Sequence, residues 1–189
     1  MTIFLASASP RRKQLLEQVN CSFQILVSDI VEDHHRKVLP GELATLNAAS
    51  KARDVAARVE PDDVVIGADT VVALDGHVYG KPQNEQEARR MLAKLSGREH
   101  TVYTGVAVVR AGRLWTDYAE TKVRIRSLNL DEIDRYVATG EPLDKAGAYG
   151  VQGIGAILVE AVYGCYSNVV GLPLVTLSRL LIKAGIRLL

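Results

Sequence analysis

The sequence predicts a mixed α/β fold of the α+β kind, and three observations carry the prediction. Residues 64–74 form an apolar, largely β-branched run that ends at Asp75-Gly76, a two-residue hairpin signal. Two further strand-like runs, 100–110 and 114–128, are separated only by Ala-Gly-Arg. Helical patterns of apolar residues lie between these runs. Hairpins mixed with helices favour a mixed sheet over strictly alternating βαβ units.

The N-terminal part is expected to contain one strand and two helices. The apolar stretch 3–6 predicts the strand, and Pro10 stands where the first turn of a helix tolerates proline. A loop rich in acidic residues and histidine follows at 29–35, and Pro40 opens the second helix. The apolar positions are Leu15, Leu16 and Val19 in the first helix and Leu43, Leu46, Val55 and Val59 in the second.

Two asparagine–glutamate pairs with the spacing of helix caps predict two helices in the second half of the chain. The pairs are Asn84 with Glu87 and Asn129 with Glu132, and the helices are expected to end near Gly97 and Gly140. The glycine-rich segment 144–155 is expected to be a loop, 155–164 a strand, and 172–185 a last amphipathic helix.

The composition indicates one domain and excludes several kinds of partner. The 189 residues, 48% of them hydrophobic, suffice for a core of their own, so we expect a single domain over residues 1–189. The net charge of +1 lacks the basic excess typical of proteins that bind nucleic acid. No apolar run is long enough for a membrane span, and the N-terminal one is too short for a signal peptide. Cys21 and Cys165 have no zinc-type spacing, which favours free thiols in a cytoplasmic protein.

The stretch LASASPRRK at 5–13 gathers small hydroxyls and cations at the start of the first predicted helix. A helix N-terminus attracts anions through its free backbone N–H groups and its dipole. Ser7 and Ser9 can donate hydroxyl groups there, and the guanidinium groups of Arg11 and Arg12 match phosphate oxygens. The stretch alone fits equally well a serine-capped helix with solvated cations.

Asp69 lies inside the buried-strand pattern VVIGADTVV. An ionised carboxylate in such a strand is costly unless it is paired, binds a metal or faces a cleft. The small residues Gly67 and Ala68 allow another group to come close. We therefore favour a functional role for Asp69 over a purely structural ion pair or a side chain that points outward at a strand edge.

Other polar residues carry weaker signals when each is taken alone. Lys51 adjoins the helix face that bears Ala44 and Ala48, and Lys81 follows the hairpin of the Asp69 strand. Both lysines, and Glu32 in its loop, are more often solvated surface residues. The adjacent histidines at 34–35 receive no role. In the glycine-rich segment 144–153, Gln152 offers both the donor and the acceptor needed to contact the edge of a base.

These motifs occur together, and in this order, in the Maf family, which the chain resembles almost from end to end. Each motif alone is weak, but seven of them in register are specific. They are SASPRRK at 7–13, SKA at 50–52, GADT at 67–70, GKP at 80–82, LSG at 95–97, EPLDKAGAYGVQG at 141–153 and VVGLPL at 169–174.

The resemblance implies a nucleoside triphosphate pyrophosphatase that uses a divalent cation, Mg²⁺ or else Mn²⁺ or Co²⁺. It also implies an elongated mixed α/β fold with a central cleft, shared with inosine triphosphate pyrophosphatases, and a homodimer. GADT together with AYGVQG resembles the branch that prefers dTTP and UTP, including modified pyrimidine nucleotides whose incorporation it would prevent. A second branch, which acts on 7-methyl-GTP, tends to have GSDQ in place of GADT.

The resemblance also assigns roles by matching positions. Asp69 matches the proposed general base, and we expect it to activate water or to hold the metal together with Glu32. The phosphates are expected at the start of the first helix, against Ser7, Ser9, Arg11 and Arg12. The remaining matches are Lys51 and Lys81, which line the cleft beside the reacting groups, and Arg11, Thr70 and Gln152, which are tied to substrate choice.

Two other functions remain open at this point. Members of the family have been associated with inhibition of septum formation and cell division, so the chain could act chiefly by binding a partner. Within enzymes, the alternative is a pyrophosphatase for purine or 7-methyl-GTP nucleotides. The strand carboxylate Asp69 argues against the first alternative, because a scaffold has no evident use for it.

Overall fold

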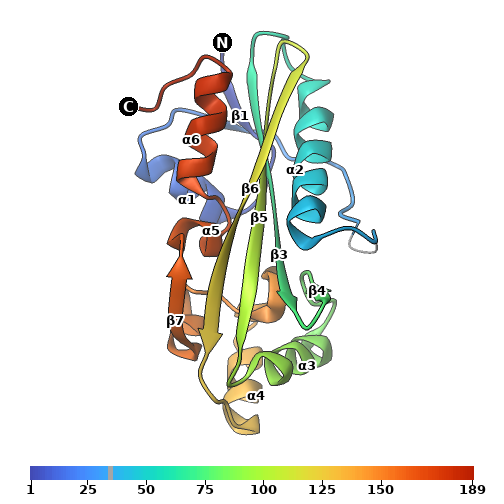
Figure 1. Cartoon of the computed structure of the whole chain (residues 1–189), viewed down its shortest axis with the longest axis vertical. Coiled ribbons are helices and arrows are strands. Elements are labelled where there is room, and N and C mark those ends of the chain that lie inside the picture. The colour runs from blue at the N-terminus through green and yellow to red at the C-terminus, as the bar shows by residue number, and fades with distance from the viewer. Residues whose placement is uncertain (34–35) are drawn as a thin grey trace.

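The computed structural model describes residues 1–33 and 36–189, and these residues form one seven-stranded mixed sheet (Figure 1). The strand order is β2-β1-β3-β5-β6-β7, and β4 pairs with β3. β1 runs parallel to β2 and β3, and the other described pairings are antiparallel. The strands are β1 (Ile3–Leu5), β2 (Gln24–Ile25), β3 (Val64–Leu74), β4 (His77–Tyr79), β5 (Glu99–Arg110), β6 (Arg113–Ile125) and β7 (Val159–Gly164).

Helices cover the sheet on both sides and at one end. Figure 1 shows an elongated molecule with α2 on one side of the long strands, α1 and α6 on the other, and α3 and α4 beside the far end of the sheet. The helices are α1 (Pro10–Gln18), α2 (Pro40–Ala56), α3 (Glu85–Leu95), α4 (Leu130–Ala138), α5 (Tyr166–Val170) and α6 (Leu174–Lys183), with short 3₁₀ turns at Glu141–Asp144, Ala146–Ala148 and Gly153–Leu158.

The alternation of side chains along β3 divides the core between the two faces of the sheet. Val64 and Ile66 face a cluster with Leu16 of α1 and with α6, whereas Val65 faces α2. Further along the strand, Val72 packs into a separate cluster with α3 and α4. The middle of β3 therefore lies between two hydrophobic clusters, one near each end of the strand.

Helix α2 lies unusually close to the sheet at two glycines. A Cβ atom on Gly67 would lie 2.3 Å from the carbonyl oxygen of Ala48, and one on Gly105 would lie 2.3 Å from the carbonyl carbon of Ala44. Both Ala44 and Ala48 are fully buried. The sequence indicated that Gly67 would allow a close approach, and the backbone of α2 is the group that makes it.

One edge of β3 is open in its middle. β5 occupies one edge of the strand over 65–73, so β1 and β4 share the opposite edge. On that edge β1 pairs with 64–66 and β4 with 72–74, and residues 67–71 have no strand partner within the described parts of the chain. The backbone edge of this stretch is therefore left without a strand partner between β1 and β4, and Asp69 and Thr70 lie on it.

The structure confirms the mixed α/β prediction and the long elements read from local patterns. Asn84 and Asn129 cap α3 and α4, and Asn129 forms a full capping box with Glu132. Strand β2 and helix α5 were not predicted. The predicted strand 155–164 begins only at Val159.

Residues Gly153–Leu158 form a 3₁₀ turn in place of the first part of the predicted strand. Within this turn, the backbone N–H groups of Ile154 and Gly155 donate to the Glu141 carboxylate. Two other predictions are not tested by the structure. The histidines at 34–35 lie outside the described residues, and the single-domain assignment stays a prediction. No described helix has the length and apolar character needed to cross a membrane.

Candidate active site

A cleft of about 420 Å³ opens where the edge of β3 is bare. Its walls come from the start of α1, the middle of β3, the segment after β4 and the glycine-rich segment 144–152. The structure brings to this cleft every residue that the sequence proposed as catalytic or substrate-binding. These are Ser7, Ser9, Arg11, Arg12, Glu32, Lys51, Asp69, Thr70, Lys81 and Gln152.

Asp69 is held from both of its carboxylate oxygens by side chains of α2. Lys51 Nζ lies 2.9 Å from Asp69 Oδ1, and Asn47 Nδ2 donates to Oδ2 over 3.0 Å. Lys51 also forms an ion pair with Glu32, so one ammonium group contacts two carboxylates. Asp69 is 2% exposed, and the close approach of α2 at Gly67 places its partners within hydrogen-bonding distance.

The setting of Asp69 changes its acidity. Burial raises the pKa of Asp69; Lys51 acts in the opposite direction, and the neighbouring carboxylate of Glu32 adds to the rise. A carboxylate with a raised pKa takes a proton from water more readily than an ordinary one. The arrangement therefore supports proton abstraction at Asp69.

Arg12 forms the second buried charged element of the cleft. Its Nη1 donates to Ser7 Oγ and its Nη2 to Thr70 Oγ1, each over 3.1 Å, and its Nε donates to the carbonyl oxygen of Gly171 over 2.8 Å. Burial lowers the pKa of Arg12, but a guanidinium group stays charged in proteins. The hydroxyl of Thr70 also bonds to Thr104 over 3.0 Å, so Thr70 contacts Arg12 rather than standing alone in the cleft.

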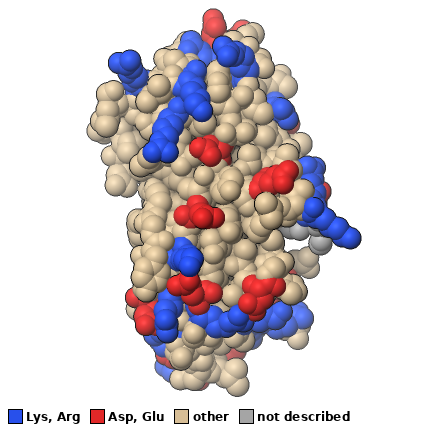
Figure 2. Space-filling view, viewed as in Figure 1, with Lys and Arg blue, Asp and Glu red and all other residues tan. Residues whose placement is uncertain are grey.

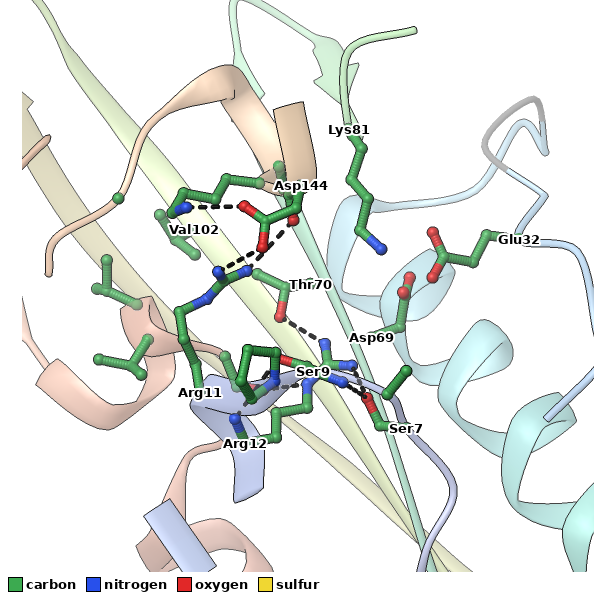
Figure 3. Close-up of a pocket in the computed structure, with 18 of the residues that line it drawn as sticks. Ser7, Ser9, Arg11, Arg12, Glu32, Asp69, Thr70, Lys81, Val102 and Asp144 are labelled. Carbon is green, nitrogen blue, oxygen red and sulfur yellow. Dashed lines mark hydrogen bonds and ion pairs between the residues drawn. The ribbon is translucent and has the colours of Figure 1, made fainter. Parts of the chain in front are cut away.

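Arg11 reaches the glycine-rich segment at Asp144 (Figure 3). Its guanidinium donates to Asp144 Oδ2 over 2.8 Å and to the Asp144 carbonyl oxygen over 3.2 Å. Lys145 Nζ contacts the same carboxylate at 2.7 Å. Although burial alone would raise it, hydrogen bonds from Lys145 and Arg11 keep the pKa of Asp144 below its ordinary value. An anionic ligand at Arg11 would compete with this carboxylate.

The remaining two predicted residues, Lys81 and Gln152, also line the cleft. Figure 3 shows the amine of Lys81 pointing toward Asp69 and Glu32 from the segment after β4. The segment that carries Gln152 is tied to the Lys81 segment by a hydrogen bond of 3.0 Å from Gly147 N to Gly80 O. The cleft thus combines carboxylates, cations and the amide of Gln152.

The donor set fits a divalent cation that is shared with a substrate. Mg²⁺ is commonly held by one or two carboxylates together with phosphate oxygens. Asp69 and Glu32 supply two carboxylates that already converge on Lys51. No cluster of three or more histidine, cysteine or acidic side chains suited to a metal occurs in residues 1–33 and 36–189, so a site made by these residues alone is not what the cleft offers.

Sequence reasoning missed the contributions of Asn47 and Asp144. Asn47 is 5% exposed and precedes Lys51 by four residues, which puts both side chains on one face of α2. That spacing was a usable signal. Asp144 pairs with Arg11 across 133 positions of sequence, and no local pattern predicts such a contact.

Comparisons with known proteins agree with the motifs. A family model described as Maf-like protein matches residues 2–184. The dTTP/UTP pyrophosphatase of Moorella thermoacetica is 53% identical over 97% of this chain and 95% of that protein. The dTTP/UTP pyrophosphatase of Pelotomaculum thermopropionicum is 48% identical over 99% of this chain and 98% of that protein. A solved structure, the Staphylococcus aureus Ham1 protein, is 13% identical and matches with a TM-score of 0.49 over 84% of this chain and 80% of that chain.

Proposed function

The chain belongs to the Maf family, and from this we propose that it is a nucleoside triphosphate pyrophosphatase that converts dTTP and UTP to the monophosphate and pyrophosphate. The observation that carries the proposal is the buried Asp69–Lys51–Glu32 cluster facing the cations at the start of α1. Hydrolysis of a phosphoanhydride needs a proton acceptor for water and positive charge around the phosphates, and the cleft provides both.

In this proposal Asp69 takes a proton from a water molecule that attacks the α-phosphorus. The bond between the α-phosphorus and the bridging oxygen breaks, and pyrophosphate leaves. Asn47 and Lys51 orient the carboxylate by holding both of its oxygens. Positioning and charge stabilisation are the main demands of phosphoryl chemistry, so these contacts belong to the catalytic apparatus.

The phosphates lie against the start of α1 and the lysine opposite it. Ser7, Arg12 and Lys81 provide hydroxyl, guanidinium and ammonium donors to the cleft, and Ser7 and Arg12 are in direct contact. Ser9 caps α1 by accepting from Arg12 N, so its hydroxyl acts at the end of the helix where the N–H groups are free. Arg11 exchanges Asp144 for a substrate oxygen when the ligand enters.

A divalent cation is part of the proposal, with Mg²⁺ as the first candidate and Mn²⁺ or Co²⁺ as substitutes. Asp69 and Glu32 are the residues that would hold it, because their carboxylates converge in the cleft; as a ligand, Asp69 would bind the cation in place of acting as the base. The bound cation would neutralise charge on the triphosphate. Chelation with EDTA is expected to abolish turnover, and added Mg²⁺ is expected to restore it.

Base choice is proposed to reside at Gln152, with contributions from Arg11 and Thr70. A site built to hydrogen-bond one base edge leaves its polar groups unpaired when another base enters, which gives large discrimination. The names of the relatives favour pyrimidine nucleotides. The homodimer and the cytoplasmic location implied by the resemblance stay predictions.

The deciding experiment is a product assay with Mg²⁺ and a panel of nucleoside triphosphates, in which monophosphate, pyrophosphate and inorganic phosphate are resolved. We expect dTTP and UTP to yield monophosphate and pyrophosphate, with Asp69→Asn reducing kcat/KM by at least about 10²-fold. Asp134→Asn, which changes an exposed carboxylate paired with Arg89, is the matched control and should keep full activity.

Three results would contradict the proposal. Release of inorganic phosphate without pyrophosphate would place the cleavage at another bond. Equal activity of Asp69→Asn and the control would remove the proposed base. No cleavage of any nucleotide would favour a role in binding.

A further inference from the structure

The segment that carries Gln152 is fastened by two side chains that do not line the cleft. The N–H of Gly150 donates to Tyr136 Oη over 3.2 Å, and the N–H groups of Ile154 and Gly155 each donate to the Glu141 carboxylate over 2.9 Å. Tyr136 Oη in turn donates to Glu141 Oε1 over 2.9 Å. The bonded amides stand on both sides of Gln152, so the segment is anchored before and after it.

The backbone of the segment packs directly against the side chains of Tyr136 and Glu141. A Cβ atom on Gly153, whose φ is +70°, would lie 2.7 Å from Glu141 Oε2. One on Gly155 would lie 2.4 Å from Tyr136 Oη. Glycine is needed at both places because the backbone rests directly on the anchoring oxygens. The position of the segment is therefore set by Tyr136 and Glu141.

The two anchoring side chains are an ionised carboxylate, Glu141, and a buried tyrosine, Tyr136. Burial alone would raise the pKa of Glu141, but hydrogen bonds from Gly155, Ile154 and Tyr136 hold it below the ordinary value. Tyr136 is 4% exposed and comes from α4, which packs in the cluster with α3. The carboxylate thus stays charged at neutral pH, and charge-assisted hydrogen bonds to amides are stronger than neutral ones.

We propose that Tyr136 and Glu141 are positioning residues for base recognition. They fix the position of Gln152 in the cleft and thereby set the preference for one base over another. This inference rests on the proposed function, in which Gln152 contacts the base. Hydrogen-bonding groups that discriminate between ligands must be held to within about half an ångström. Gln152 has no side-chain hydrogen bond to the described residues, so its placement depends on its backbone.

The test measures kcat/KM for dTTP and for dCTP in Tyr136→Phe and Glu141→Gln. Each variant keeps the size of the side chain and weakens the anchor. We expect the ratio of the two kcat/KM values to fall by about three- to tenfold, which corresponds to loss of one hydrogen bond of ordinary strength. The loss should appear mainly as a higher KM for dTTP, with kcat little changed. Tyr163→Phe and Glu160→Gln alter exposed side chains and serve as controls.

A double-mutant cycle with Gln152→Ala separates positioning from general support of the fold. If Tyr136 acts through Gln152, Tyr136→Phe should change the ratio little in the Gln152→Ala background. An undiminished effect in that background would overturn the inference, as would equal losses for dTTP and dCTP. Should Tyr136→Phe fail to fold, Glu141→Gln carries the test alone.

The outcome for the wild-type protein keeps the two proposals apart. A wild type that cleaves dTTP and dCTP equally well would refute the proposed base preference itself. A wild type that discriminates, with variants that discriminate equally well, refutes the positioning role and leaves the proposed function intact.

Discussion

Replacing Lys51 with methionine tests the electrostatic account of the cleft. The change removes the ammonium between Asp69 and Glu32 and keeps most of the side-chain volume. In the wild type, Lys51 Nζ lies 2.9 Å from Asp69 Oδ1, and the two side chains are 9% and 2% exposed. Removing one partner of such a buried pair costs about 3–5 kcal/mol, because the remaining charge is left uncompensated.

The loss of unfolding free energy in Lys51→Met should depend on pH in a defined direction. The folded-state pKa of Asp69 is already raised, and without Lys51 it rises further, since burial and Glu32 then act without the opposing ammonium. A carboxyl group with a raised folded-state pKa makes folding less favourable as pH rises through that value. The variant should therefore be destabilised more at pH 7 than at pH 5, because protonation of Asp69 is more favourable at the lower pH and removes buried charge.

The assay is urea unfolding of wild type and Lys51→Met at both pH values. A loss of about 3–5 kcal/mol corresponds to a fall in Tm of roughly 6–20 °C for a domain of this size. Lys13→Met is the control, because Lys13 pairs with Glu17 at 3.6 Å on the surface and such pairs contribute about 0–1 kcal/mol. An equal loss at pH 7 and pH 5 would refute the reasoning, since a packing defect alone has no reason to vary with pH.

Three further predictions follow from other contacts. Asn47→Ala should lower kcat about tenfold with KM little changed, because the substitution removes the hydrogen bond that holds one carboxylate oxygen of Asp69. Steady-state kinetics measure both constants, and a change in KM alone would contradict the prediction. Gly67→Ala should force α2 from the sheet, cost roughly 1–3 kcal/mol and lower kcat/KM, whereas Gly76→Ala, which meets no atom within 4 Å, should bear only backbone strain and keep its activity. Burial lowers the pKa of His100 to about 4, so the unfolded state binds its proton first and stability should fall as pH drops from about 6.5 toward 4. His100→Gln should flatten that part of the stability profile in urea titrations; an unchanged slope would show that other groups cause it.

Local patterns were enough to predict the elements whose causes are local. Asn84 and Asn129 cap helices because their side chains accept from the third following amide, and residues 64–74 form a strand because they are apolar and β-branched. The charge of Asp69 in that strand was likewise visible as an unfavourable placement. The order of motifs then supplied the family, which the comparisons confirm.

Features that depend on distant segments were not predictable. The contact between Arg11 and Asp144 requires α1 and the glycine-rich segment to lie side by side. No local sequence pattern near either residue predicts that arrangement. β2 is two residues long and exists because β1 offers it a parallel edge. The bare stretch of β3 follows from where β1 and β4 stop, which is a property of the assembled sheet.

That bare stretch has a consequence for solubility as well as for chemistry. A strand edge with free N–H and C=O groups is a template on which a strand of another molecule can pair and begin aggregation. Here Ala68, Asp69 and Val71 of that stretch are almost fully buried, and the cleft beside it is lined by charged side chains, among them Arg11, Lys81 and Asp144. Figure 2 shows acidic and basic side chains interspersed on the lower part of the molecule as well. A small anion can enter such a cleft, whereas an extended polypeptide would have to displace its charged walls, so these charged residues shield the open edge of the strand from pairing with another chain.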